Sequence, residues 1–180
     1  MNKKISVIIP MYNAESVIIR AVQSVLNQTI DIDEIIIVDD GSKDDSFDVI
    51  SKFAIDNSSA NIRVEKKLNG GASSARNFGI LHARNEILAF LDSDDEWVSN
   101  KLENQIDYIV RDDVVLVGGN HFDKIIQYIS LKKAKGVNEI TLRDLLFKNY
   151  FQTSTVMTKK SIALNFDCFN ENQKYAEEGQ

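Results

Sequence analysis

The chain has 180 residues, a formal net charge of −6 at pH 7, 43% apolar residues and one cysteine. This length suffices for one domain with a substantial core, and the apolar fraction is ordinary for a globular protein. The negative charge and the lack of a basic stripe argue against a nucleic-acid partner. A lone Cys168 excludes an intramolecular disulfide and fits a reducing compartment.

The first residues carry no targeting signal. A short basic lead at Lys3 and Lys4 precedes an apolar run that Pro10 interrupts. We therefore predict neither a signal peptide nor a transmembrane segment, and we expect a cytoplasmic protein.

Short apolar runs alternate with segments of helical periodicity over the first two thirds of the chain. Apolar runs predict strands at residues 5–10, 34–38, 62–65, 87–91 and 114–117, and helical spacing predicts helices at residues 14–28, 46–55, 73–83 and 100–110. Continuous apolar strands that alternate with helices are typical of a mostly parallel sheet with helices on both faces. We therefore predict an α/β, Rossmann-like fold.

From residue 125 onward the pattern is less regular. Here the sequence predicts strands at residues 125–129 and 153–157, a basic hairpin or loop at residues 132–135, and a short helix at residues 141–147. No repeat, low-complexity stretch or linker interrupts the chain. We therefore expect residues 1–180 to form a single domain.

Polar clusters follow three of the predicted strands at the points where these strands end. The clusters lie at residues 10–15, 39–42 and 92–95. Ligands of open α/β sheets bind outside the carboxyl ends of the strands, so we expect the three clusters to meet at one edge of the sheet.

The most informative cluster is acidic, because Asp92, Asp94 and Asp95 place three carboxylates within four residues. Crowded like charges repel one another and are costly to desolvate, and a divalent cation offsets that cost. Mg²⁺ and Mn²⁺ take oxygen ligands and share them with substrate phosphates. The cluster therefore points to a metal bridge to a nucleotide diphosphate, with a solvated acidic turn as the alternative. We expect Trp97 to pack into the core beneath this loop.

Two further segments carry groups that suit a nucleotide. Asp39 and Asp40 follow a buried strand, and a carboxylate there can accept hydrogen bonds from a base N–H or from ribose hydroxyls. Residues 69–77 form a Gly-rich loop that opens a helix, where backbone N–H groups and Arg76 suit phosphate. An ordinary turn and an ordinary helix N-cap are the alternatives.

Together these segments resemble family 2 glycosyltransferases of the GT-A fold. The residues that carry the resemblance are 6–15, 36–42 with Asp44, Gly70, Ala72, 75–77, Gly79, 90–95 and Trp97. The resemblance is close over the first hundred residues and resumes more weakly over residues 153–178. It implies a nucleotide-binding half at about residues 1–100 and an acceptor-side part at about residues 101–180.

The resemblance implies a nucleotide-diphosphate sugar donor, commonly a UDP-sugar, and a divalent metal ion, Mn²⁺ or Mg²⁺. The residues that it implies for the nucleotide sugar are Pro10, Tyr12, Asn13, Glu15, Asp39, Asp40, Arg76, Asp92, Ser93 and Asp95. Within this set, Asp40 is expected to hold the base, with Asp39 nearby, and Arg76 to face the base or the diphosphate. Asp94 is the expected principal metal ligand, with Asp92 near the ribose and the metal.

The implied reaction is inverting transfer, in which an acceptor hydroxyl attacks the anomeric carbon opposite the departing diphosphate. A carboxylate takes the hydroxyl proton, and the metal stabilises charge on the leaving group. Glu177 and Glu178 match the acidic pair that carries this base in the family, which makes Glu178 the candidate base. The family usually has Asp at the second position, so which of the two acts as base stays open.

The chain stops two residues after Glu178, whereas family members usually continue with helices that shape the acceptor site. We therefore expect a C-terminally truncated domain. The resemblance implies a glycan or lipid-linked acceptor in polysaccharide biosynthesis, and a lipid-linked acceptor would bring the chain to the cytoplasmic face of the membrane.

Three alternatives stay open. One is a fragment that binds nucleotide sugar without transferring it. Another is a phosphoacceptor receiver domain, although its acidic pair normally follows the first strand, whereas Asp39 and Asp40 follow the second. The third is a dehalogenase-type phosphatase with Asp92 as nucleophile, although its acidic motif normally lies near the start of the domain.

Overall fold

The computed structural model describes residues 3–119, 126–130, 152–166 and 168–171. Its elements in chain order are β1 (Ile5–Met11), α1 (Ile18–Leu26), β2 (Glu34–Asp39), α2 (Ser46–Asp56), β3 (Ile62–Lys66), α3 (Ala72–His82), β4 (Ile87–Phe90), α4 (Lys101–Ile109), β5 (Val114–Gly119), β6 (Ile126–Ser130), the 3₁₀ turn η1 (Thr153–Thr155), β7 (Met157–Lys159) and α6 (Lys160–Asn165). The hairpin predicted at residues 132–135 and the helix predicted at residues 141–147 lie outside the described residues.

Within the described residues, seven strands form one sheet in the order β3-β2-β1-β4-β7-β5-β6. The four strands β3, β2, β1 and β4 pair in parallel. β7 pairs antiparallel with both β4 and β5, and β6 pairs antiparallel with β5. Five strands therefore share one direction and two oppose it, which confirms the predicted mostly parallel α/β sheet.

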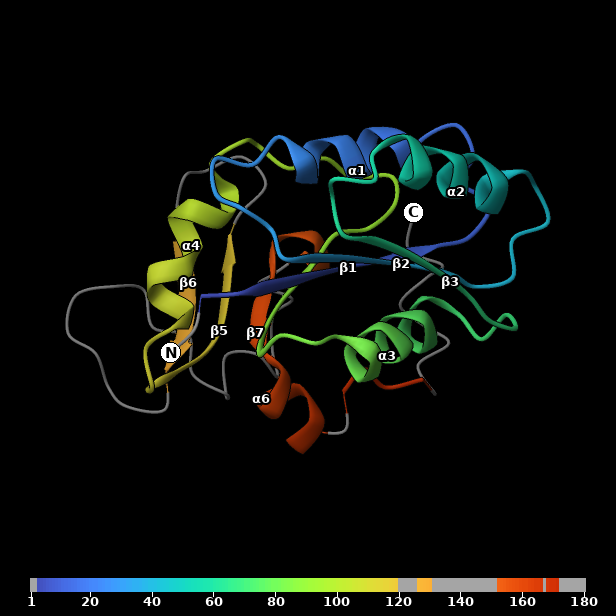
Figure 1. Cartoon of the computed structure of the whole chain (residues 1–180). Coiled ribbons are helices and arrows are strands. Elements are labelled where there is room, and N and C mark those ends of the chain that lie inside the picture. Colours follow the sequence, from blue (N-terminus) through green and yellow to red (C-terminus); the bar gives the residue numbers. More distant parts are fainter. Residues whose placement is uncertain (1–2, 120–125, 131–151, 167, 172–180) are drawn as a thin grey trace.

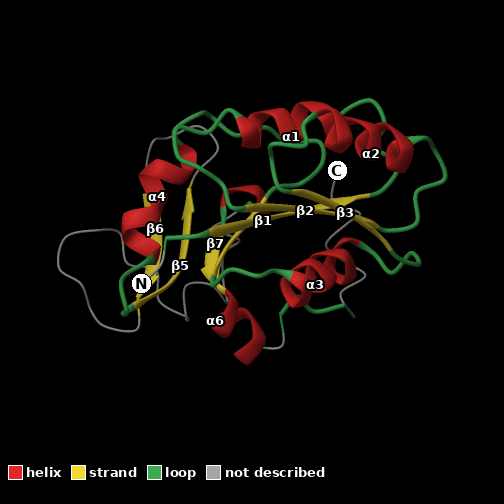
Figure 2. Ribbon diagram, viewed as in Figure 1, coloured by secondary structure: helices red, strands yellow, loops and turns green. Residues whose placement is uncertain are grey.

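Helices cover both faces of this sheet, with α1 and α2 on one side and α3 and α6 on the other (Figures 1 and 2). Alternate residues of a strand serve opposite faces. On β1, Val7 and Ile9 pack with α1, α2 and α4, whereas Ile8 packs with α3. All residues of β1, β2 and β4 are buried, which explains why these strands read as continuous apolar runs.

Helix α3 lies unusually close to the sheet at Gly79. A Cβ atom on this glycine would lie 2.5 Å from Ile8 Cγ2, a separation that real Cβ atoms do not adopt. Glycine therefore allows the helix to approach β1 closely. The approach brings the first turns of α3 toward the carboxyl ends of the strands.

Two boundaries differ from the predictions by more than two residues. The strand predicted at residues 153–157 is wrong in its first half, because residues 153–155 form a 3₁₀ turn and the strand begins at Met157. Helix α1 begins at Ile18 rather than at residue 14. The Ala14 N–H donates to Ser46 Oγ at 2.7 Å, so the first residue of α2 fixes the residues before α1.

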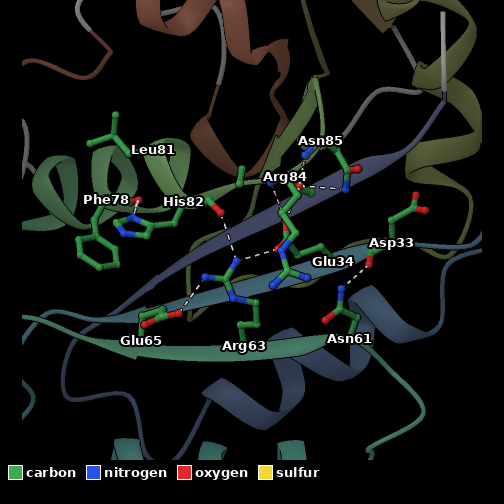
Figure 3. Close-up of polar contacts among 12 residues, drawn as sticks. Asp33, Glu34, Asn61, Arg63, Glu65, Phe78, Leu81, His82, Arg84 and Asn85 are labelled. Carbon is green, nitrogen blue, oxygen red and sulfur yellow. Dashed lines mark hydrogen bonds and ion pairs between the residues drawn. The ribbon is translucent and has the colours of Figure 1, made fainter.

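The end of the sheet where the parallel strands begin is held by a buried carboxylate (Figure 3). Glu34 is 1% exposed and accepts hydrogen bonds from Ser6 Oγ, Arg63 Nη1 and the Arg84 N–H. Burial by itself raises the pKa of Glu34, but the hydrogen bonds from Arg84, Arg63 and Ser6 outweigh it and hold this pKa below its usual value. Arg63 also donates to the His82 carbonyl, which ties the end of α3 to β3.

Candidate functional site

The carboxyl ends of β1, β2 and β4 lie at one edge of the sheet, because these parallel strands are neighbours. Met11 is paired with Asp39, and Ile8 with Phe90. The polar clusters at residues 10–15, 39–42 and 92–95 follow these strand ends, so the structure brings the three clusters to one edge.

The loops after β1 and β2 lock together through their polar groups. Asn13 adopts a left-handed φ of 49°, its N–H donates to Ser42 Oγ at 3.0 Å, and its Oδ1 accepts from the Lys43 N–H at 2.8 Å. Glu15 Oε2 accepts from the Asp45 N–H at 3.1 Å. Asn13 and Glu15, both predicted to bind the nucleotide, thus shape the rim of the site through their neighbours.

Tyr12 and Pro10 differ from each other in their exposure to solvent. Tyr12 is 44% exposed, which makes it one of the few large apolar side chains at the surface near the strand ends. Pro10 is buried within β1, where it pairs with Val38.

Asp40 organises the Gly-rich loop. Its carboxylate accepts hydrogen bonds from Lys67 Nζ at 2.6 Å, from the Gly70 N–H at 3.0 Å and from the Gly71 N–H at 2.7 Å. Its side chain is 3% exposed, and its backbone carbonyl accepts from Asn69 Nδ2. Both carboxylate oxygens are therefore engaged by the loop that opens α3.

Asp39, in contrast to Asp40, has one carboxylate oxygen that accepts no hydrogen bond. It is fully buried, and its Oδ1 accepts from the Ser42 N–H at 3.0 Å, but its Oδ2 is buried without a hydrogen bond. Lys66 Nζ lies 3.6 Å from this oxygen, beyond hydrogen-bond range. Buried polar atoms are almost always hydrogen-bonded, so an unpartnered oxygen at a strand end marks a place where a donor is missing.

Arg76 of α3 reaches the start of the acidic loop. Its Nη2 lies 2.6 Å from Asp92 Oδ1, and its guanidinium carbon lies 5.3 Å from the centre of the Phe169 ring. Its Nε is buried without a hydrogen bond. The pair neutralises one of the three crowded carboxylates and leaves a donor of the guanidinium unused.

The other carboxylates of the acidic loop are less engaged. Asp94 is exposed, and among the described residues its carboxylate makes no hydrogen bond or ion pair, although its carbonyl accepts from Arg20 Nη2. Asp95 Oδ2 accepts from Ser154 Oγ at 2.5 Å. Ser93, between Asp92 and Asp94, is half-buried.

The loop fits a metal that a substrate shares and does not form a closed protein cage. Over residues 3–119, 126–130, 152–166 and 168–171, no three acidic, histidine or cysteine side chains form a ready metal cluster. Mg²⁺ is usually bound by one or two carboxylates together with substrate phosphates. An exposed Asp94, with Asp92 and Asp95 in the same loop, supplies oxygen ligands of that kind.

Side chains of α1 and of a residue shortly after it form hydrogen bonds with the backbone of the acidic loop and of the residues that follow it. The sequence did not predict these contacts. Arg20 donates to the Asp94 carbonyl, Ser24 Oγ accepts from the Trp97 N–H, and Gln28 donates to the Val98 carbonyl. Arg20 and Ser24 are four apart in α1 and share one helix face, which was the available signal, whereas Gln28 lies two residues beyond the end of the helix. Trp97 is buried in the core, which confirms its predicted position.

The candidate bases Glu177 and Glu178 lie outside the described residues. The described segment that precedes them is hydrogen-bonded to Asn77 of α3. The Phe169 N–H donates to Asn77 Oδ1, and Asn77 Nδ2 donates to the Phe169 carbonyl, both at 2.8 Å. This segment lies next to Arg76, whose guanidinium faces the Phe169 ring.

In the part of the chain that the structure describes, no helix is both long enough and apolar enough to span a bilayer.

Curated relatives share the sequence over most of the chain. An uncharacterized glycosyltransferase of Haemophilus influenzae is 33% identical over 156 residues, which are 87% of this chain and 62% of the relative. A UDP-Glc:alpha-D-GlcNAc-diphosphoundecaprenol beta-1,3-glucosyltransferase of Escherichia coli, WfaP, is 39% identical over 66% of this chain and 46% of its own length. This chain thus spans about half to three fifths of these two relatives.

Solved structures share the fold. Residues 1–349 of S. aureus TarS in complex with UDP are 25% identical with a TM-score of 0.68, over 96% of this chain and 52% of that one. The mannosyltransferase PcManGT of Pyrobaculum calidifontis is 18% identical with a TM-score of 0.73, over 94% of this chain and 48% of that one. These neighbours are GT-A enzymes, which confirms the fold that the resemblance implied.

The sequence profile described as "Glycosyl transferase family 2" matches residues 6–172. The match includes all three strand ends and the acidic loop, and it leaves the receiver and phosphatase interpretations without support. The chain belongs to glycosyl transferase family 2.

Proposed function

We propose that this chain is the donor-binding part of an inverting, metal-dependent glycosyltransferase that moves a sugar from a UDP-sugar to an acceptor hydroxyl. The observation that carries the proposal is that two carboxylates with spare oxygens lie at one sheet edge. Asp39, at the end of β2, has a buried oxygen without a hydrogen bond, and Asp94, after β4, makes no carboxylate contact among the described residues, with β1 between the two strands. The names of two similar proteins support UDP as the nucleotide, since one uses UDP-Glc and the other was solved with UDP.

At the base end of the donor, the proposal assigns Asp39 in place of Asp40. A uracil N–H is a donor of the kind that Asp39 Oδ2 lacks, whereas both oxygens of Asp40 already accept hydrogen bonds from the Gly-rich loop. Tyr12, which is half exposed, offers an aromatic face at the same rim, and Pro10 lies beneath it in β1.

At the diphosphate end, Asp94 would be the principal ligand of Mn²⁺ or Mg²⁺, with Asp92 beside it. A bound divalent ion supplies charge stabilisation to the leaving diphosphate. Arg76 lies against Asp92 and retains an unused donor, so its guanidinium is available to a phosphate oxygen. Asp95 and Ser93 would contact the sugar or the metal from the same loop.

On the acceptor side, Glu178 is the proposed base that removes the proton from the acceptor hydroxyl, with Glu177 beside it. The proposed acceptor is a glycan or a lipid-linked glycan of polysaccharide biosynthesis, consistent with the diphosphoundecaprenol acceptor in the name of the Escherichia coli relative. With such an acceptor the chain would work at the cytoplasmic face of the membrane.

The test is thermal unfolding with UDP, GDP, CDP and dTDP, each with and without Mn²⁺. A ligand at a hundred times its dissociation constant stabilises a protein by about 2.7 kcal/mol. Stabilisation by UDP that requires Mn²⁺ is the expected result. Asp94→Ala should abolish the Mn²⁺-dependent part, and the matched control Asp56→Ala, an exposed acid at the end of α2, should not. No shift with any diphosphate would contradict the proposal.

A second candidate is a fragment that binds donor without transferring the sugar. The chain spans only 46% of the Escherichia coli relative and 52% of the TarS segment. Release of UDP from UDP-sugars with lipid-linked acceptors separates the two candidates. Glu178→Gln should keep donor binding and stop this release, and wild-type turnover in that variant would eliminate Glu178 as the base.

A further inference from the structure

Ser154 connects both ends of the acidic loop to a segment that lies about sixty residues later in the chain. Its hydroxyl donates to Asp95 Oδ2 at 2.5 Å and accepts from the Asp92 N–H at 3.0 Å. Its backbone carbonyl accepts from Trp97 Nε1 at 2.6 Å. Ser154 is 6% exposed, so these bonds form away from water.

The directions of these hydrogen bonds leave the hydroxyl little freedom. A serine hydroxyl has one proton, and here that proton goes to Asp95 while a lone pair receives the Asp92 N–H. The bridge therefore fixes the distance between the two ends of the loop and holds the Asp95 side chain in one rotamer. The second oxygen of Asp95 makes no hydrogen bond among the described residues, so it stays available to a ligand.

Ser154 itself is held in place by the sheet. It lies in η1, directly before β7, and β7 pairs with β4, the strand that leads into the acidic loop. The Phe90 N–H at the end of β4 donates to the Val156 carbonyl at 3.1 Å. The strand pairing thus places the hydroxyl beside the loop before any ligand binds.

We propose that Ser154 is a positioning residue of the metal–donor site, which acts by aiming the Asp95 carboxylate at the cation and the sugar diphosphate. The inference rests on the proposed function and adds to it a residue that contacts no ligand. Groups that orient the ligands of a metal typically change its affinity by about 10- to 100-fold when they are removed.

The far end of the acidic loop has independent support, so loss of the hydroxyl frees the Asp95 carboxylate and the Asp92 N–H without releasing the rest of the loop. Arg20 holds the Asp94 carbonyl, and Ser24 holds the Trp97 N–H. The expected effect of Ser154→Ala is therefore on the cation and only weakly on the fold.

The experiment measures Mn²⁺ binding by electron paramagnetic resonance in the presence of saturating UDP, with thermal unfolding as the measure of fold. Ser154→Ala should weaken Mn²⁺ binding about 10- to 100-fold and broaden the bound-Mn²⁺ spectrum. Ser154→Thr, which keeps the hydroxyl, should restore both. The matched control is Thr158→Val on β7, because the Thr158 hydroxyl donates to the Val115 carbonyl and does not contact the acidic loop.

A double-mutant cycle separates positioning from general support. If Ser154 acts through Asp95, Ser154→Ala should add almost no loss of Mn²⁺ affinity in an Asp95→Asn background. Equal Mn²⁺ affinity and spectra for Ser154→Ala and Thr158→Val would overturn the proposal. So would additive losses in the cycle. If Ser154→Ala does not fold, the near-isosteric Ser154→Cys, whose thiol is a weak donor, takes its place and should show the same loss.

The two proposals fail differently. A wild-type protein that binds UDP with no Mn²⁺ resonance change lacks the metal site, which overturns the role of Ser154 and the metal dependence but leaves the donor site. A wild-type protein that binds Mn²⁺ with UDP, together with an unaffected Ser154→Ala variant, overturns the role of Ser154 alone.

Discussion

Lys67 Nζ lies 2.6 Å from Asp40 Oδ1, and the two side chains are only 17% and 3% exposed. The same carboxylate accepts the N–H groups of Gly70 and Gly71. Gly71 adopts a left-handed φ of 89°, which an L side chain rarely adopts, so this turn depends on both its glycine and the carboxylate it surrounds. The ion pair thus joins the end of β2 to the loop that opens α3.

Asp40→Ala should destabilise the protein by about 3–5 kcal/mol, since it removes the counter-charge of a mostly buried ammonium and the acceptor of two N–H groups. Urea denaturation measures the loss. Asp31→Ala, an exposed acid before β2, is the control and should stay within about 0.5 kcal/mol of wild type. Equal midpoints for Asp40→Ala and wild type would show that the pair contributes nothing to the fold.

Asp39→Asn should separate stability from binding. The substitution removes a buried negative charge whose Oδ2 has no hydrogen bond, so the melting temperature should stay the same or rise. Affinity for UDP should fall, because the asparagine side chain can present its amide NH2 group, a hydrogen-bond donor, where the base N–H requires an acceptor. Calorimetric titration with UDP and Mn²⁺ tests this, with Asp31→Asn as control. Wild-type affinity in Asp39→Asn would remove Asp39 from the base site.

The parallel part of the fold is predictable from the sequence because its strands are buried on both faces. The centres of β1, β2 and β4 are continuous apolar runs, which is typical of strands covered on both sides. The segment at residues 153–157 was harder to predict. Thr153, Ser154 and Thr155 have the composition of a strand, yet Ser154 turns toward the acidic loop and the strand begins three residues after it, at Met157.

The sequence predicted that the three polar clusters meet at one sheet edge, as the structure has them, but it could not distinguish the surroundings of Asp39 from those of Asp40. Asp39 and Asp40 are neighbours of the same type, and only the fold shows that Asp40 is surrounded by the Gly-rich loop while Asp39 keeps a buried oxygen without a hydrogen bond. The contact between Ser154 and Asp95 joins residues 59 apart in sequence. No local pattern encodes such a contact, because the pairing of β7 with β4 creates it.

Glu34 should make the stability depend on pH in the acid range. Its pKa in the folded protein lies below the ordinary value of 4.5, so the unfolded chain binds more protons between these two values. The stabilisation is therefore present above about pH 4.5 and is lost as the pH falls through the folded pKa. Glu34→Gln should lower the stability at pH 7 by about 3–5 kcal/mol and flatten this pH dependence.

Urea denaturation from pH 3 to pH 7 tests the role of Glu34. The matched control is Glu65→Gln, because Glu65 pairs with the other nitrogen of Arg63 but is 34% exposed at its side chain. That pair should contribute no more than about 1 kcal/mol. Parallel pH curves for wild type and Glu34→Gln would assign the acid sensitivity to other groups.

Gly79→Ala should destabilise the protein by about 1–3 kcal/mol, because the new methyl group would lie 2.5 Å from Ile8 Cγ2 and would push α3 away from β1. Helix propensity alone would give the opposite sign, since Ala is the better helix former. Gly119→Ala is the matched control, because its Cβ would approach no described atom closer than 3.9 Å. In an Ile8→Ala background the cost of Gly79→Ala should shrink, since the clashing atom is gone. An additive double mutant, measured by urea denaturation, would mean that the close approach of α3 to β1 does not depend on this glycine.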